Sequence, residues 1–144
     1  MFWSLFASKN QKLVNGWVKE HSRIVTLAHK VIDTYSKDNL RDTRKALSEL
    51  NSVALMHLMT EDIEFYRLLK DKTRADEQTQ RLVNEFTTSF RDTKMVLRDF
   101  LLTYTKEDAV LNDEFFTTFK SIVDVLAKRI VFEEEHVYKI LAAK

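Results

Sequence analysis

Cysteine and proline are absent from this chain of 144 residues, and glycine occurs only once, at Gly16. Without cysteine, the chain can form neither a disulfide framework nor a thiolate metal site. This composition fits a reducing cytoplasm, which is where we expect the protein to reside. Proline and glycine are the strongest helix breakers, and with 44% hydrophobic residues the chain is too apolar to be disordered. The composition therefore predicts a folded, all-α protein.

An excess of one charge is also lacking, since 23 Lys and Arg residues face 22 Asp and Glu residues. This balance gives no general attraction to nucleic acid or to an anionic membrane, so we expect neither as a partner. No apolar run approaches the roughly 18 residues of a membrane span. The short apolar segment 1–7 lacks the basic region of a signal peptide. Two interpretations of it stay open: it folds back over one end of the protein, or its aromatic residues contact a protein partner or a second copy of the chain.

Four segments carry apolar residues at the alternating spacings of three and four that are typical of amphipathic helices. They cover about residues 8–35, 40–72, 75–104 and 113–143. A run of turn-forming residues at 36–39 separates the first two, and Asn112 is a natural N-cap for the last. Helices of similar length with short connections pack antiparallel. The sequence therefore predicts one domain, residues 1–144, folded as an up-down-up-down four-helix bundle.

Polar residues interrupt the apolar stripes at inward-facing positions. His21, His57, Glu61 and Glu133 all fall on the faces that should form the core. Burying a lone carboxylate costs several kcal/mol unless a partner compensates its charge. Bundle metal sites are built from inward Glu and His side chains on facing helices, and nitrogen and oxygen donors suit Fe, Mn or Zn. This pattern predicts a cation site, with His136 as a further donor three residues after Glu133.

Each of these residues also has an ordinary structural interpretation. His21 could be a core histidine bonded to a neighbour, and His57 with Glu61 could be a simple i,i+4 pair at a helix seam. Glu133 could form a salt bridge with Arg129, four residues earlier. Three helices would then each need a separate explanation, so we favour the single explanation of a bound cation.

The same residues resemble a known family. The order and spacing of His21, then the pair His57-x-x-x-Glu61, then Glu133-Glu134 with Tyr138 near the end of the chain are similar to those of hemerythrin-like (HHE, cation-binding) domains. Such domains are four-helix bundles that bind a non-haem di-iron centre and serve in oxygen binding, iron handling or oxygen and redox sensing. The resemblance implies His21, His57, Glu61 and Glu133 as ligands, with iron and dioxygen as partners.

This chain departs from the family pattern at two positions. The third segment has no His, and Gln78 or a nearby residue stands where the family places one. Arg129 stands where a fourth-helix His is expected, and an arginine cannot ligate a metal. The expected cofactor is therefore mono- or di-iron, with Mn or Zn as alternatives, or no metal at all if the altered site is vestigial.

A second resemblance leads to a different function. The segments 11–17 and 129–134 look like the ends of the bacterial anti-sigma family, metal-free helical bundles that bind the housekeeping sigma subunit of RNA polymerase. No nucleophile triad or phosphate-binding loop is visible, and one glycine makes a Gly-rich loop implausible. We therefore expect a binding or sensing protein and not an enzyme, with the anti-sigma function as the alternative.

Overall fold

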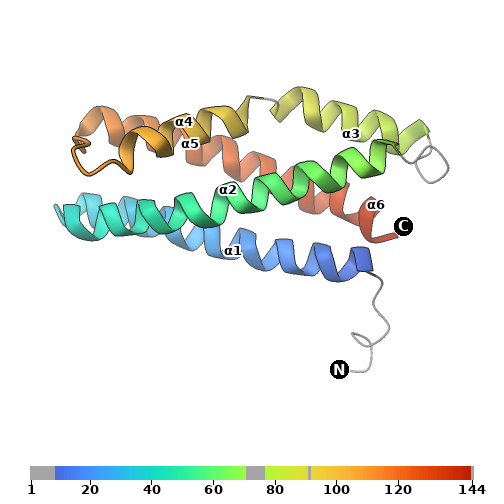
Figure 1. The fold of residues 1–144 in the computed structure, drawn as a ribbon, viewed down its shortest axis with the longest axis horizontal. Helices are drawn as coiled ribbons and strands as arrows, with labels where there is room; N and C mark the ends of the chain where they lie inside the picture. Colours follow the sequence, from blue (N-terminus) through green and yellow to red (C-terminus); the bar gives the residue numbers. More distant parts are fainter. Residues whose placement is uncertain (1–8, 71–76, 91, 144) are drawn as a thin grey trace.

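The computed structural model describes residues 9–70, 77–90 and 92–143, all of which belong to helices or to their connections. Its helical elements form an up-down-up-down four-helix bundle, and the described residues include no strand (Figure 1). The prediction of an all-α bundle is confirmed. The N-terminal segment 1–7 lies outside the described residues, so its interpretation stays a prediction. The elements are α1 (Lys9–Ser36), α2 (Leu40–Lys70), α3 (Glu77–Phe90), α4 (Thr93–Tyr104), α5 (Asp113–Phe132), the π-helix η2 (Glu133–Val137) and α6 (Tyr138–Ala143).

The ends of the helices follow the polar signals in the sequence. Asp38 takes a left-handed backbone conformation, with φ of 58°, in the turn between α1 and α2, a conformation that Asp tolerates better than most residues. The Asn39 side chain accepts a hydrogen bond from the backbone N–H of Asp42 at the start of α2. Asn112 does the same for Phe115 at 3.0 Å, so it caps α5 as predicted.

The third of the four antiparallel segments of the bundle consists of two helices, whereas the sequence predicts a single helix there. Helix α3 ends at Phe90 and α4 begins at Thr93, with Asp92 at the N-cap position but without a side-chain capping bond. Buried Phe86 and Leu97 lie on either side of this break. The apolar spacing runs through it undisturbed, so the prediction of a continuous helix over residues 75–104 was wrong.

The helix α5 is rotated slightly from its predicted orientation. The sequence predicts one inward stripe, which includes Phe116, Phe119, Val123, Leu126, Ile130, Glu133 and Val137. The structure buries Phe119, Leu126, Glu133 and Val137 but leaves Phe116, Val123 and Ile130 half-buried. The residues directly before those three, Phe115, Ile122 and Arg129, are buried in their place.

The core consists of two apolar clusters with a polar layer between them. The larger cluster includes Leu47, Leu101 and Phe119 and fills the half of the bundle that contains the α1–α2 turn. The smaller one joins Trp17, Phe86 and Val137. Along α1, buried His21 lies between members of the two clusters, which places the predicted ligands in the interior.

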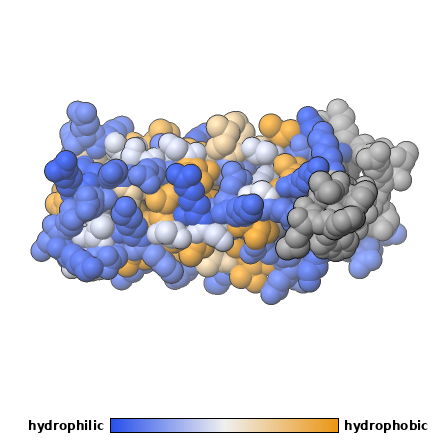
Figure 2. Space-filling view, turned by 90° about the horizontal axis from the view of Figure 1, so that it is seen from below, coloured by the Kyte–Doolittle hydropathy of each residue, from blue (hydrophilic) through white to orange (hydrophobic). Residues whose placement is uncertain are grey.

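The outer surface is mixed in character. One face of the bundle is largely hydrophilic, with hydrophobic residues scattered among the polar ones (Figure 2). Exposed Val18 and Val25 illustrate this scatter on α1. Among the described helices, none combines the length and the hydropathy that crossing a membrane requires. Gly16 is also exposed, and a Cβ added there would meet nothing within 4 Å.

Candidate metal centre

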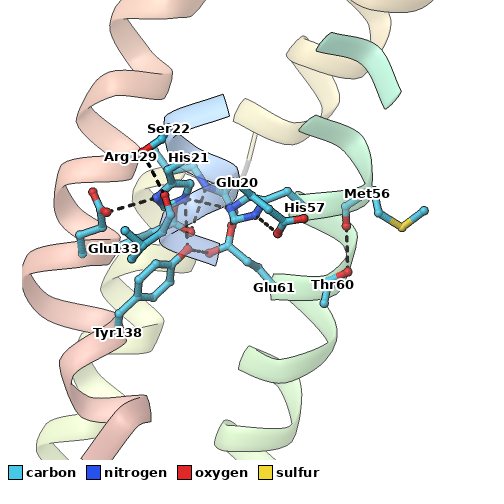
Figure 3. A network of polar contacts seen from close by, with 12 residues as sticks. Glu20, His21, Ser22, Met56, His57, Thr60, Glu61, Arg129, Glu133 and Tyr138 are labelled. Carbon is cyan, nitrogen blue, oxygen red and sulfur yellow. Dashed lines mark hydrogen bonds and ion pairs between the residues drawn. The ribbon is translucent and has the colours of Figure 1, made fainter. Parts of the chain in front are cut away.

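Four buried side chains from three parts of the chain meet in the polar layer. His21 comes from α1, His57 and Glu61 from successive turns of α2, and Glu133 from η2 (Figure 3). One nitrogen or oxygen atom from each lies within 4.8 Å of the corresponding atoms of the other three. None of the four residues is more than 3% exposed. The structure thus brings together four of the residues that the sequence predicts as ligands.

The inner atoms of these side chains converge on one small region. His57 Nε2 lies 2.8 Å from His21 Nε2 and 2.6 Å from Glu61 Oε1. His21 Nε2 lies 3.3 Å from Glu133 Oε1. Oε2 of Glu133 is buried without a hydrogen-bond donor. Ligand atoms around one cation with bonds of about 2.1 Å are roughly 3 to 4 Å apart. Two of the three distances lie slightly below this range, so small outward shifts of these side chains would let them bind a single metal ion.

The outer nitrogen of each imidazole faces a glutamate nearer the surface. His57 Nδ1 lies 2.9 Å from Glu20 Oε1, and His21 Nδ1 lies 3.8 Å from Glu134 Oε1. The side chains of both glutamates are more than a third exposed. A carboxylate on the outer nitrogen fixes the orientation of a metal-binding histidine and raises the basicity of the inner nitrogen. The pair His57–Glu20 has the closer geometry of the two.

A tyrosine from the last helix contacts two of these four residues. The Tyr138 hydroxyl donates a hydrogen bond of 2.6 Å to Glu61 Oε2 and lies 3.1 Å from His21 Nε2. Burial, together with the nearby carboxylates of Glu61 and Glu133, raises the pKa of Tyr138 far above its ordinary value. The hydroxyl therefore stays protonated and remains a donor to Glu61.

The π-helical segment η2 explains how Tyr138 reaches the centre. It spans Glu133–Val137, and the wider turn of a π-helix places residues five apart on the same side of the chain. Glu133 and Tyr138, which are five apart, both lie against His21. Single-turn π-helices inside α-helices are frequent at functional sites.

Arg129 is the one buried positive residue at the centre with a permanent charge. It is 3% exposed, and its Nε lies 3.6 Å from Glu133 Oε2. Its guanidinium carbon lies 5.0 Å from the centre of the Phe86 ring on α3. Nε and Nη2 of Arg129 have no hydrogen-bond acceptor.

The two histidines differ in their affinity for protons. Burial lowers the pKa of His21 to about 4, and the charge of His57 adds to this effect. Burial also acts against the charged form of His57, but the hydrogen bonds and charges of Glu61 and Glu20 outweigh it and raise its pKa. His21 is therefore neutral near pH 7, the form in which imidazole binds metals.

The pKa values of the two buried carboxyl groups are also shifted in opposite directions. Burial acts to raise the pKa of Glu61, but hydrogen bonds with Glu133 and His57 outweigh it and lower the pKa to about 2. Burial and the neighbouring Glu61 raise the pKa of Glu133 well above its ordinary value. Two carboxyl groups that share a buried site without a cation behave in this way. A bound cation would compensate both charges at once.

A small cavity of about 20 Å³ adjoins the centre. It is bounded by His21, His57, Arg129 and Glu133 and otherwise by apolar side chains of α1, α2, α4 and α5. A cavity of this volume holds about one water-sized molecule. The space beside the centre therefore suits a very small ligand and excludes an organic substrate.

Two of the predicted site residues do not join the cluster. His136 is exposed, and its ring packs against Phe132 at 5.0 Å between centroids, because it lies on the outer side of η2. Gln78 is exposed in the first turn of α3. In place of the histidine expected on the third helix, α3 presents the carbon side chains of Val83 and Phe86 to the interior.

Sequence reasoning gave Glu20, Tyr138 and Trp17 no contact at the site, although Trp17 falls on the core-facing stripe and Tyr138 is among the residues that resemble the family. The Trp17 ring lies 6.2 Å from the His57 ring and 5.4 Å from the Tyr138 ring, measured between centroids. Glu20 could have been found, because it lies one turn after Trp17 on nearly the same face of α1. The contact of Tyr138 with the centre could not be predicted, because it depends on the π-helical turn.

The profile of the hemerythrin HHE cation-binding domain matches residues 12–141 of the chain. The chain belongs to this family. Curated proteins and solved structures give no match. As a hemerythrin HHE domain, the protein has the expected helical bundle and a buried His and Glu cluster of the kind that binds a cation. In this domain Arg129 is buried at the centre, and the described residues that α3 buries are Val83 and Phe86.

Proposed function

We propose that this hemerythrin HHE domain binds one non-haem iron ion through His21, His57, Glu61 and Glu133. The observation that carries the proposal is the convergence of four buried donor atoms within 4.8 Å. Bound iron would supply a one-electron redox couple and a position for a small ligand. The inner atoms of the four residues would hold the ion, and one of their oxygens, Oε2 of Glu133, otherwise has no hydrogen-bond donor.

The surrounding residues would hold the ligands in position. Glu20 orients the His57 ring through Nδ1, and Tyr138 fixes one oxygen of Glu61 while leaving the other directed at the centre. Because these ligands are oriented before the ion arrives, binding requires little rearrangement.

We further propose that the protein acts in oxygen or iron binding or in redox sensing, and not in catalysis. The cavity of about 20 Å³ beside the centre leaves room for a molecule of the size of water or dioxygen. An enzyme acting on an organic substrate would need a much larger pocket than this cavity beside the four ligands.

The test is the metal content of protein purified without chelators. We expect about one iron per chain by elemental analysis, and loss of that iron in the double variant His57→Ala, Glu61→Ala. The matched control is His136→Ala, which removes an exposed imidazole near the centre and should keep the iron. A ligand that binds only the folded state stabilises that state by about 2.7 kcal/mol when its concentration is 100 times its Kd. The melting temperature should therefore rise with added metal in the control and not in the double variant.

The alternative function is a metal-free regulatory bundle of the anti-sigma type. It is favoured by the internal pairing of the polar side chains, since Arg129 faces Glu133 and His57 faces Glu61. If wild-type protein contains no Fe, Mn or Zn and its melting is indifferent to added metal, the iron proposal is wrong. A binding assay with the sigma subunit would then test the alternative.

A further inference from the structure

Arg129 differs in kind from the other residues of the centre. A buried guanidinium is costly unless negative charge surrounds it, and here the side chain is 3% exposed with two nitrogens lacking hydrogen-bond acceptors. Oε2 of Glu133 lies 3.6 Å from its Nε. The ring of Phe86 faces it at 5.0 Å, a distance at which an aromatic ring attracts a cation. The guanidinium is thus held as a cation beside the proposed metal ligands.

We propose that the positive charge of the Arg129 guanidinium replaces that of a second metal ion. The centre then binds one metal ion and favours that ion in its divalent state. This inference rests on the proposed iron-binding function. A second divalent ion would meet the repulsion of a fixed positive charge at a distance of a few ångströms. It would also lack donors, because the buried side chains that α3 and α4 present to the described interior are all apolar.

The preference for the divalent state follows from the same charge. Oxidation of Fe²⁺ to Fe³⁺ removes one electron and adds one positive charge to the buried centre. A fixed guanidinium nearby makes that added charge less favourable, since interactions between charges are stronger in the interior than in water. Arg129 therefore raises the midpoint potential of bound iron. It acts through its electrostatic field and does not ligate the ion.

The competing interpretation is that Arg129 only neutralises Glu133 as a structural ion pair. That role would affect folding stability but would not set metal stoichiometry or redox potential. The variants Arg129→Met and Arg129→Lys separate the two, because Met keeps a similar length without charge and Lys keeps the charge. Arg98→Met, at a side chain that is half exposed on α4, is the matched control.

The experiment first measures iron and Zn²⁺ stoichiometry of the wild-type protein, and then the midpoint potential of the iron form by titration with redox mediators. We expect one ion per chain. We expect the potential to fall in Arg129→Met so that the ratio of ferric to ferrous protein at a fixed potential rises at least tenfold, which for one electron corresponds to 59 mV. Arg129→Lys and Arg98→Met should stay within that shift of the wild type.

Two ions per wild-type chain would overturn the inference, even if no variant at Arg129 folds. An unchanged potential in folded Arg129→Met, or an equal fall in Arg129→Lys, would also overturn it. These results would leave the assignment of the four residues as iron ligands intact. Failure of the wild type to bind any metal would instead refute the proposed function, and this inference with it.

Discussion

Removal of one hydroxyl group, in Tyr138→Phe, tests whether the polar layer holds the bundle together. The hydroxyl is buried and donates a hydrogen bond of 2.6 Å to Glu61, whose lowered pKa keeps it ionised. Hydrogen bonds to charged groups contribute about 1.5–3 kcal/mol to stability. Phenylalanine fills nearly the same volume, so no cavity is added. We therefore expect the metal-free protein to lose about 2 kcal/mol in its free energy of unfolding.

The assay is urea denaturation followed by circular dichroism, supported by thermal melting. A chain of this length has an unfolding entropy of about 0.3 kcal/mol/K, so the loss corresponds to a fall of roughly 7 °C in Tm. The control is Tyr35→Phe, which makes the same chemical change at an exposed hydrogen bond of 3.1 Å to Asp113. Exposed interactions of this kind contribute little, and we expect a loss of under about 0.5 kcal/mol.

Equal losses in the two variants would refute the reasoning. The hydroxyl of Tyr138 would then contribute no more than one in water, and Glu61 would not depend on it. A changed urea m-value in Tyr138→Phe would show that the variant unfolds by a different transition, and only the Tm comparison would then apply.

Three further substitutions test separate parts of the structure. Gly16→Ala should stabilise the protein by up to about 1 kcal/mol in urea denaturation, because glycine is a poor helix former and the added Cβ meets nothing within 4 Å; a loss of stability would contradict this. Asn112→Ala should cost about 1 kcal/mol, because it removes the bond that caps α5; an unchanged urea midpoint would show that the cap is dispensable. Glu20→Gln should weaken metal binding about 10- to 100-fold in a Zn²⁺ titration, since the carboxylate orients His57, whereas wild-type affinity would mean that His57 needs no such partner.

The fold could be predicted because the apolar spacing and the breaks between segments agree. Segments rich in apolar residues at spacings of three and four can bury a face only as helices, and the turn at residues 36–39 and the cap at Asn112 are visible in the sequence. The break between α3 and α4 was missed for a physical reason. Phe86, Leu97 and Leu101 keep a regular helical spacing across it, so the pattern is the same whether the helix is continuous or interrupted at Asp92.

The orientation of α5 could not be decided from periodicity. Apolar residues occupy both of two adjacent stripes, and either could face inward. The structure buries Arg129 more fully than its neighbour Ile130, against the usual preference for apolar residues in a core. The carboxyl group of Glu133 favours this orientation, because it offers Arg129 a partner within the interior. Packing between helices and pairing of charges thus decide what the local pattern leaves open.

The ligands and their supporting residues differ in how they can be found. His21, His57, Glu61 and Glu133 are polar residues on apolar stripes, and such exceptions are visible in any regular helix. Tyr138 is five residues beyond Glu133, which in a regular α-helix places it roughly 140° around the axis. Only the wider turn of η2 brings the two to the same side. The irregular turn therefore adds Tyr138 to the centre, and a sequence pattern that assumes regular helices places this residue away from the site that its hydroxyl contacts.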